Sequence, residues 1–170
     1  MELNQELKFI FANIIDLQKF AESKHAGFIV LNAGLIVGIL ANYSSIQCSL
    51  FKLAILIGLV CFGLSIFLSV ISQFPKTKNT YSRKKIIITP NLYFFGHLSH
   101  IDYQMFVDEL QKVDNDYKPT KFDSDLINQI LVNARITQSK FVLFKWASTI
   151  TTLGFGIIGT SILIKLLWHF

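Results

Sequence analysis

The length, composition and charge of the chain exclude an ordinary soluble domain. Of its 170 residues, 52% are hydrophobic and 16% are charged, whereas a soluble domain carries about 25% charged residues. Acidic residues occur only within residues 2–22 and 102–125, as expected for a membrane protein, because a carboxylate at the bilayer centre costs roughly 2.5–3.5 kcal/mol. The chain has a net charge of +5, and its excess basic residues lie beside apolar segments. We therefore expect the chain to contact a lipid bilayer with anionic headgroups, and not nucleic acid.

Residues 1–24 are predicted to form an amphipathic helix. Apolar residues recur along one helical face, and they are Leu3, Leu7, Ile10, Ile14, Leu17 and Ala21. Three placements of this helix stay open: on the membrane surface, in line with the apolar segment that follows, or paired with another cytoplasmic helix.

Three apolar segments come close to or exceed the ~20 residues that cross a ~30 Å hydrocarbon core. They cover residues 26–43, 50–71 and 142–167. We therefore predict an all-α integral membrane protein with three transmembrane helices. Residues 25–72 form a transmembrane hairpin, and residues 142–170 contain the third span.

Residues 73–141 are predicted to be a small, mostly helical cytoplasmic segment. Ten Lys and Arg residues lie between Gln73 and Lys140, and none lies in the short turn 42–49. The positive-inside bias then places the N-terminus and this segment in the cytoplasm and the C-terminus outside. We expect a multi-pass protein of the cell inner membrane.

Two helices are predicted within this segment. Ser99 followed by Asp102 is typical of a helix cap, and it begins a helix over residues 101–112. The next helix begins at Thr120 or Asp123. Because no proline follows Pro119, this helix is expected to be long and continuous to about residue 167, over roughly 65 Å at 1.5 Å per residue.

Small residues form stripes along all three predicted spans. Such stripes let helices approach closely in lipid. We interpret them mainly as surfaces for packing within the chain, with packing between copies in a homo-oligomer as the alternative. The residues are Gly34 and Gly38 in the first span, Ala54, Gly58, Ser65 and Ser69 in the second, and Ser148, Thr152, Gly156 and Thr160 in the third.

Two polar residues accompany the first span. Lys24 lies just before it and is interpreted as an interfacial anchor. Asn32 lies inside it and should face protein or water rather than lipid. A structural role is the interpretation we favour for Asn32, and a role in a pore is the alternative.

Nothing in the chain assembles an acid, a base and a nucleophile, so we expect no enzymatic activity. Residues 154–159 match G-x-G-x-x-G, but they lie inside a span and follow no strand. His97 and His100 form H-x-x-H, yet zinc needs two further ligands and residues 73–141 contain no Cys. We expect no metal and no cofactor, and interpret Cys48 and Cys61 as inert packing residues.

Several groups of residues resemble the Pycsar transmembrane effectors in the same order and spacing over nearly the whole chain. They are Glu22–Gly27 with Asn32–Gly34 at the entry to the first span, Thr89-Pro90 with Tyr93–Gly96 and Tyr103 in the cytoplasmic segment, and Ile127–Lys140 before the last span. Ser23 stands where those proteins usually have Asp, and His25 is inserted before Ala26.

The resemblance implies antiphage defence. A partner cyclase makes a nucleotide second messenger after infection, and the effector disrupts the inner membrane. Direct sensing of that nucleotide would need cations and aromatic faces. The candidate ligand-binding residues are Arg83, Lys84, Lys85, Tyr93, Phe95 and Arg135. The candidate gating or packing residues are Lys24, Asn32, Gly34, Gly38, Gly156 and Lys140.

Two other functions stay open from the sequence. The first is a non-enzymatic membrane anchor or adaptor that recruits a cytoplasmic partner. The second is a transporter or channel subunit. The charged residues of the spans, Lys52, Lys145 and Lys165, lie near the span ends, and the lack of charge deeper inside argues against ion-coupled transport. On overexpression an effector should arrest growth or depolarise cells, whereas an adaptor should be harmless.

Overall fold

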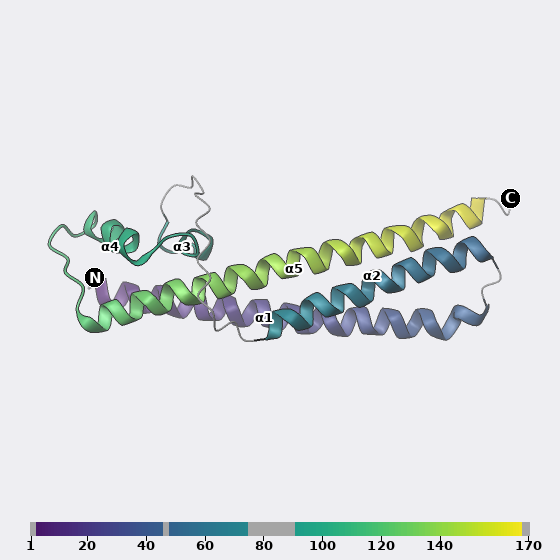
Figure 1. Cartoon of the computed structure of the whole chain (residues 1–170), viewed down its shortest axis with the longest axis horizontal. Helices are drawn as coiled ribbons and strands as arrows, with labels where there is room; N and C mark the ends of the chain where they lie inside the picture. The colour runs from purple at the N-terminus through teal and green to yellow at the C-terminus, as the bar shows by residue number, and fades with distance from the viewer. Residues whose placement is uncertain (1–2, 46–47, 75–90, 168–170) are drawn as a thin grey trace. The chain divides into compact units, whose positions relative to one another are not determined.

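The computed structural model of the chain describes residues 3–45, 48–74 and 91–167. Regular structure in these ranges consists of helices, and no strand occurs among them (Figure 1). The helices are α1 (Leu3–Asn42), the 3-10 helix η1 (Tyr43–Ser45), α2 (Ser49–Gln73), α3 (Phe95–Leu98), α4 (Tyr103–Gln111) and α5 (Lys121–Leu167). The predicted all-α fold class is confirmed.

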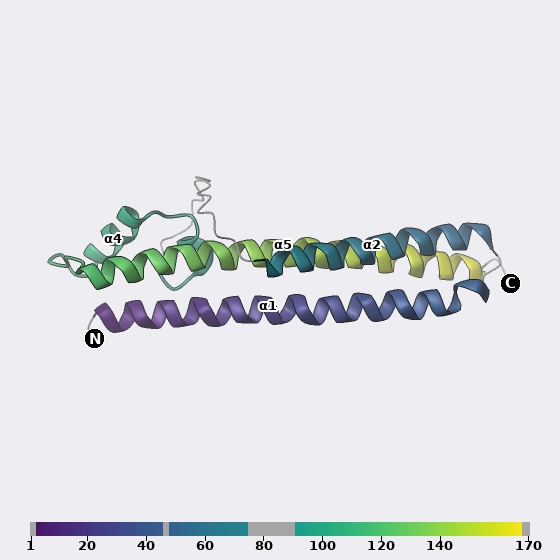
Figure 2. The same ribbon diagram turned by 60° about the horizontal axis from the view of Figure 1, so that its bottom comes forward.

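Helices α1, α2 and α5 are each long and apolar enough to cross a membrane, which confirms the three predicted spans. Helix α5 has 47 residues, or about 70 Å at 1.5 Å per residue, more than twice a ~30 Å hydrocarbon core. Helix α1 has 40 residues, so the N-terminal amphipathic segment runs straight into the first span. Figure 2 shows α1 and α5 as unbroken ribbons.

The chain divides into two compact units. Unit 1 is built from residues 1–21 and 75–141, and unit 2 from residues 22–74 and 142–170. Both boundaries within α1 and α5 fall inside a continuous helix, so each of these helices contributes to both units. Unit 1 combines residues of the N-terminal segment with residues of the middle segment, and the predicted domain bounds stay a prediction.

Unit 1 is organised around a hydrophobic core. Its buried members are Leu7, Ile10, Ile14, Leu98, Ile101, Phe106, Val107, Leu110, Ile127, Ile130, Leu131 and Ala134. The predicted apolar face of the N-terminal helix thus packs against other helices of the same unit. Burial of each large side chain of this kind contributes about 1.5–3 kcal/mol.

Unit 2 is a bundle of α1, α2 and α5. Between residues 50 and 71 of α2, the large side chains that point outward are apolar, as contact with lipid requires, and they include Leu53, Leu56, Val60, Leu64 and Phe67. All three serines in the second half of α2 point inward instead, and they are Ser65, Ser69 and Ser72. These three serines are therefore turned away from the lipid-facing side of α2.

Helices α1 and α5 run parallel, with the same register in each unit. In unit 1, Asn4 Nδ2 donates a hydrogen bond to Asp123 Oδ1 at 2.9 Å across a sequence separation of 119 residues. In unit 2, Thr151 Oγ1 donates to Asn32 Oδ1 at 2.9 Å, also across 119 residues. The ring of His25 meets the ring of Phe144, 119 positions later (144 − 25), with centroids 5.4 Å apart.

The predicted cap of the middle helix is wrong by three residues. Helix α4 begins at Tyr103, and its cap is Asp102, whose side chain accepts from Met105 N at 2.9 Å. Ser99 instead donates to the Gly96 carbonyl at 2.9 Å, at the end of the short helix α3, which was not predicted. Ser and Asp are both good caps, but the hydroxyl of Ser99 is bonded within the turn of α3, so Asp102 is the residue that caps α4.

Candidate functional site

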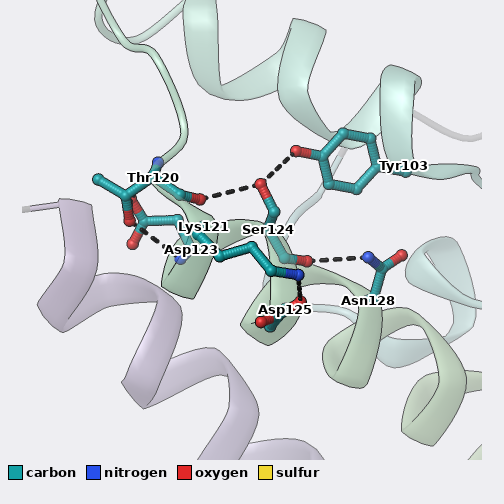
Figure 3. Close-up of polar contacts among 7 residues, drawn as sticks. All are labelled: Tyr103, Thr120, Lys121, Asp123, Ser124, Asp125 and Asn128. Atoms are coloured by element: carbon teal, nitrogen blue, oxygen red, sulfur yellow. Dashed lines mark hydrogen bonds and ion pairs between the residues drawn. The ribbon is translucent and has the colours of Figure 1, made fainter.

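The start of α5 is held by reciprocal polar contacts in unit 1 (Figure 3). Thr120 donates from its backbone N and its Oγ1 to Asp123 Oδ2 at 3.0 and 2.9 Å, and Asp123 N donates to Thr120 Oγ1 at 3.2 Å. This is a capping box that begins α5 at the first of the two predicted residues. Tyr103 and Ser124 add a hydroxyl pair at 2.9 Å, which ties α4 to α5.

The carboxylate of Asp123 also joins α1 to α5. Burial raises the pKa of this carboxyl, but the hydrogen bonds from Asn4 and Thr120 and the charge of Lys8 outweigh burial, so the pKa lies below its ordinary value. The group therefore stays ionised at neutral pH, where its hydrogen bonds are strongest.

The predicted ligand residues that the structure describes contact three different partners. Tyr93 donates from its hydroxyl to Glu6 Oε2 at 2.6 Å, and this bond raises the pKa of the phenol. Phe95 stacks on Phe141 of α5 at 5.2 Å between centroids. Arg135 donates from Nη2 to the Ile101 carbonyl at 3.0 Å.

Tyr93 keeps about half of its surface exposed, at 49%, so a ligand can reach part of this side chain. Arg83, Lys84 and Lys85 lie outside the described residues. The nucleotide site predicted from these six residues stays a prediction.

A polar network crosses the interior of unit 2 and joins all three helices. Thr151 of α5 bonds to Asn32 of α1 at 2.9 Å and to Ser65 of α2 at 2.8 Å. The hydroxyl of Ser65 also reaches the Ala147 carbonyl at 3.0 Å, and Asn32 Nδ2 donates to the Phe28 carbonyl of its own helix at 2.8 Å. Thr151, Asn32 and Ser65 are each at most 3% exposed.

The proton count of this network favours one arrangement. Each hydroxyl has one proton and can rotate it. The two hydroxyls have two protons for three contacts, so only two of the contacts are hydrogen bonds at one time. If Ser65 turns its proton from the Ala147 carbonyl, which already accepts a bond within α5, to Thr151 Oγ1, and Thr151 donates to Asn32 Oδ1, the amide oxygen is satisfied. If Thr151 donates to Ser65 instead, the amide oxygen loses its donor at a cost of about 1–3 kcal/mol. Thr151 therefore bridges the other two helices, and Asn32 faces protein, as predicted.

The gating or packing role of Gly34, Gly38 and Gly156 stays a prediction, and the structure leaves open space beside all three. A methyl group added at any of these three would meet no atom of the described residues within 4 Å, apart from its chain neighbours and the nearby backbone of its own helix. Packing within the chain uses Gly58, which belongs to the predicted stripe of the second span, and Gly154, which was not in a predicted stripe. An added methyl would lie 2.7 Å or less from Ile158 at Gly58, and 3.0 Å from Cys61 and Phe62 at Gly154. The buried face of α5 carries Ala147, Thr151 and Gly154, so it is rotated from the predicted stripe.

The two predicted lysines lie in different surroundings. Lys24 is exposed, and its ammonium lies 5.4 Å from the centroid of the Phe144 ring in unit 2, an attractive cation–π arrangement. Lys140, in unit 1, is buried at 6% exposure. Their predicted roles in gating stay predictions.

The histidines of the H-x-x-H motif form hydrogen bonds or pack within unit 1. His100 Nδ1 lies 2.7 Å from the Gly96 carbonyl. Burial lowers the pKa of His97, the charge of Glu109 partly raises it, and His100 lowers it further. Among residues 3–45, 48–74 and 91–167, no group of three or more His, Cys, Asp or Glu is placed to hold a metal.

Comparison with known proteins identifies the family of this two-unit chain. The family model of the Pycsar effector protein domain matches residues 6–167. The chain belongs to the Pycsar effector family. A curated Pycsar effector protein from a Rhizobium species, RsPycTM, is 28% identical to this Pycsar effector over 154 residues, which cover 85% of each chain. No solved structure gives a significant match.

The family match covers both units of this Pycsar effector, so the protein is an antiphage transmembrane effector. Sequence analysis identified Asn32 and the stripe that holds Ser65, but it missed Thr151. Thr151 could have been found from its spacing, because Ala147, Thr151 and Gly154 recur on one helical face. The neighbouring Thr152 has the same chemistry and lies on another face, so the sequence alone does not tell which of the two is buried.

Proposed function

We propose that this effector responds to a cyclic nucleotide made by a partner cyclase and then disrupts the membrane that it spans. The observation that carries the proposal is the continuity of α1 and α5. Each helix begins in unit 1 and continues into unit 2 without interruption. A rearrangement in unit 1 therefore has two covalent helical routes into the membrane bundle.

The trigger is proposed to act on unit 1. Family membership supports a cyclic-nucleotide signal. The half-exposed ring of Tyr93, held by its bond to Glu6, offers a face on which a base can stack, a contact worth about 1–3 kcal/mol. Arg83, Lys84 and Lys85 are the proposed phosphate contacts, on the grounds of their charge.

We further propose a multi-pass arrangement in the inner membrane, with the N-terminus and residues 73–141 in the cytoplasm and the C-terminus outside. The Lys and Arg excess of residues 73–140 supports this orientation. A homo-oligomer is also proposed, and the open surroundings of Gly34, Gly38 and Gly156 support it. The effector is proposed to act without enzymatic chemistry.

The test is the membrane potential of bacteria that express the chain inducibly together with a panel of nucleotide cyclases, each paired with its catalytically inactive variant. Depolarisation with one active cyclase, and not with its inactive variant, supports the proposed function. An unchanged potential with every cyclase, with the protein present in the inner membrane, favours the adaptor function instead.

A matched pair of variants tests the sensing surface in the same cells. Tyr93→Ala removes the proposed stacking face, and it is expected to abolish the cyclase-dependent depolarisation. Phe122→Ala removes an equally aromatic side chain that is 83% exposed at the start of α5, and it is expected to leave the response intact. Equal responses from both variants would remove Tyr93 from the site.

A further inference from the structure

The interior of unit 2 changes from polar to apolar about half-way along the bundle. We call the end that holds Glu22, Phe74 and Val142 the junction end, and the end at η1 the hairpin end. Gln73 Nε2 donates to the Glu22 carbonyl at 3.2 Å, which aligns α1 with α2 there. The buried polar residues of the half nearer the junction end are His25, Asn32, Ser65, Ser69, Ser72 and Thr151.

The polar half reaches the middle of the bundle. Asn32 lies ten residues past Glu22 (32 − 22), and Thr151 lies nine past Val142 (151 − 142). At 1.5 Å per residue, both are about 14 Å from the junction end, or half of a ~30 Å hydrocarbon core. Ser65, nine residues before Phe74, lies at the same depth.

An apolar plug closes the other half. Phe62 has no exposed surface, and its ring meets the ring of Phe155 edge-on at 5.3 Å. Gly58 and Gly154 bring α2 and α5 so close that a methyl group added at Gly154 would lie 3.4 Å from the Gly58 carbonyl oxygen. The side chain of Ile158 lies against Gly58. These five residues, which we call the plug, bring no polar side chain into the interior.

The polar half also contains a hydroxyl that protein does not satisfy. Ser69 has no exposed surface, and its Oγ has no hydrogen-bond partner among the described residues. A buried polar group in this state costs about 1–3 kcal/mol, and a bond to water would offset that cost.

We propose that the polar half of the interior is one end of a water and ion path, and that the plug is its gate. This inference rests on the proposed function, membrane disruption. Hydrophobic constrictions block conduction by excluding water. Activation separates α2 from α5 at Gly58 and Gly154, water passes Phe62, and the hydroxyls of Ser65 and Thr151 exchange their mutual bonds for bonds to water.

The outward-facing threonines of α5 are the competing candidates for the lining, and their hydrogen bonds argue against them. Thr149, Thr152 and Thr160 each donate to the carbonyl four residues earlier in α5, at 2.8–2.9 Å. Their hydroxyls are satisfied within the helix, so they need no water. The groups that gain from hydration lie inside the bundle.

The first experiment removes the plug. Phe62→Ala is expected to depolarise cells without any cyclase, because water and ions pass the open constriction. Phe62→Leu keeps apolar bulk and is expected to stay silent until triggered. Phe67→Ala, which removes a ring that is 61% exposed on the same helix, is the matched control and is also expected to be silent. A silent Phe62→Ala that reaches the membrane and still responds to the trigger would overturn the gate.

The second experiment measures whether water reaches Ser65, by replacing this serine with a cysteine of nearly the same shape. Ser65→Cys is placed in a background without Cys48 and Cys61 that still responds to the cyclase, and cells are treated with a small charged thiol reagent. Labelling of Ser65→Cys only after triggering, with Thr152→Cys unlabelled throughout, supports the path. Triggered depolarisation without labelling of Ser65→Cys overturns the path and leaves the proposed function standing. No depolarisation of the unmodified chain with any cyclase overturns both.

Discussion

The bridging position of Thr151 leads to a prediction that two neighbouring residues can test. Thr151→Val removes the hydroxyl that joins Asn32 and Ser65, whereas Thr152→Val removes one that bonds only to the Ser148 carbonyl of its own helix. Both changes replace threonine by a residue of the same shape at adjacent positions of α5. The two variants differ in whether the lost hydroxyl joins separate helices.

The magnitude follows from the contacts. Thr151→Val deletes the contacts to Asn32 and Ser65, and Ser65 then donates to the Ala147 carbonyl instead. Interhelical hydrogen bonds in membrane proteins average about 0.6 kcal/mol each and reach about 1.7 kcal/mol. The substitution also leaves Asn32 Oδ1 without its donor, and no cavity is created because valine fills the same volume. We expect a loss of about 1–3 kcal/mol in the free energy of unfolding. Thr152→Val should change it by less than about 0.5 kcal/mol.

The assay is reversible unfolding of the purified chain in mild detergent, titrated with a denaturing detergent and followed by helical circular dichroism. The single variant Asn32→Leu and the double variant with Thr151→Val complete a double-mutant cycle. The double variant should lose less stability than the sum of the two single losses, because both changes remove the same bond. Equal losses from Thr151→Val and Thr152→Val would refute the bridge. So would full additivity in the cycle.

Three further changes should alter stability in the same assay. Gly154→Ala is expected to cost about 1–3 kcal/mol through overpacking against Cys61 and Phe62, whereas Gly156→Ala, which meets open space, should be nearly neutral; equal effects would contradict the close approach of α2 and α5. The pKa of Asp123 is lowered in the folded chain, so its contribution is present above the ordinary pKa of about 3.9 and is lost as pH falls through the folded value. Melting curves should therefore show a steeper acid loss for the unmodified chain than for Asp123→Ala. Burial lowers the pKa of His97, the charge of Glu109 partly raises it, and the charge of His100 lowers it further. As pH drops below about 6.5, His97 is therefore protonated in the unfolded chain before it is protonated in the folded one, and stability should fall. His97→Gln should weaken that dependence, and an unchanged pH profile would show that His97 is not its source.

The spans and the long last helix were predictable because their signals are compositional. Apolar runs long enough to cross a bilayer and the absence of proline after Pro119 need no knowledge of packing. The placement of the N-terminal helix was not predictable. Its apolar face suits a membrane surface as well as the core around Leu7 and Ile10, and the choice depends on the partner helices.

The buried face of each span was also beyond the sequence. Thr151 and Thr152 are adjacent and chemically identical, but they point about 100° apart around α5, and only the positions of α1 and α2 decide which is buried. The same holds for Gly154 and Gly156, of which the first packs and the second does not. For α4, Ser99 and Asp102 are both good caps, and the unpredicted turn of α3 decided between them.

The separation of 119 residues between Asn32 and Thr151 has a consequence for biosynthesis. At roughly 5–20 residues per second, Thr151 is translated about 6–24 s after Asn32. The hairpin of α1 and α2 is therefore made, and meets the insertion machinery, before the partner of its buried amide exists. The local bond from Asn32 Nδ2 to the Phe28 carbonyl forms within α1, so only the amide oxygen lacks its partner until α5 is made. A nascent chain stopped before α5 should accordingly be held by insertion factors or degraded, and the arrival of α5 releases it.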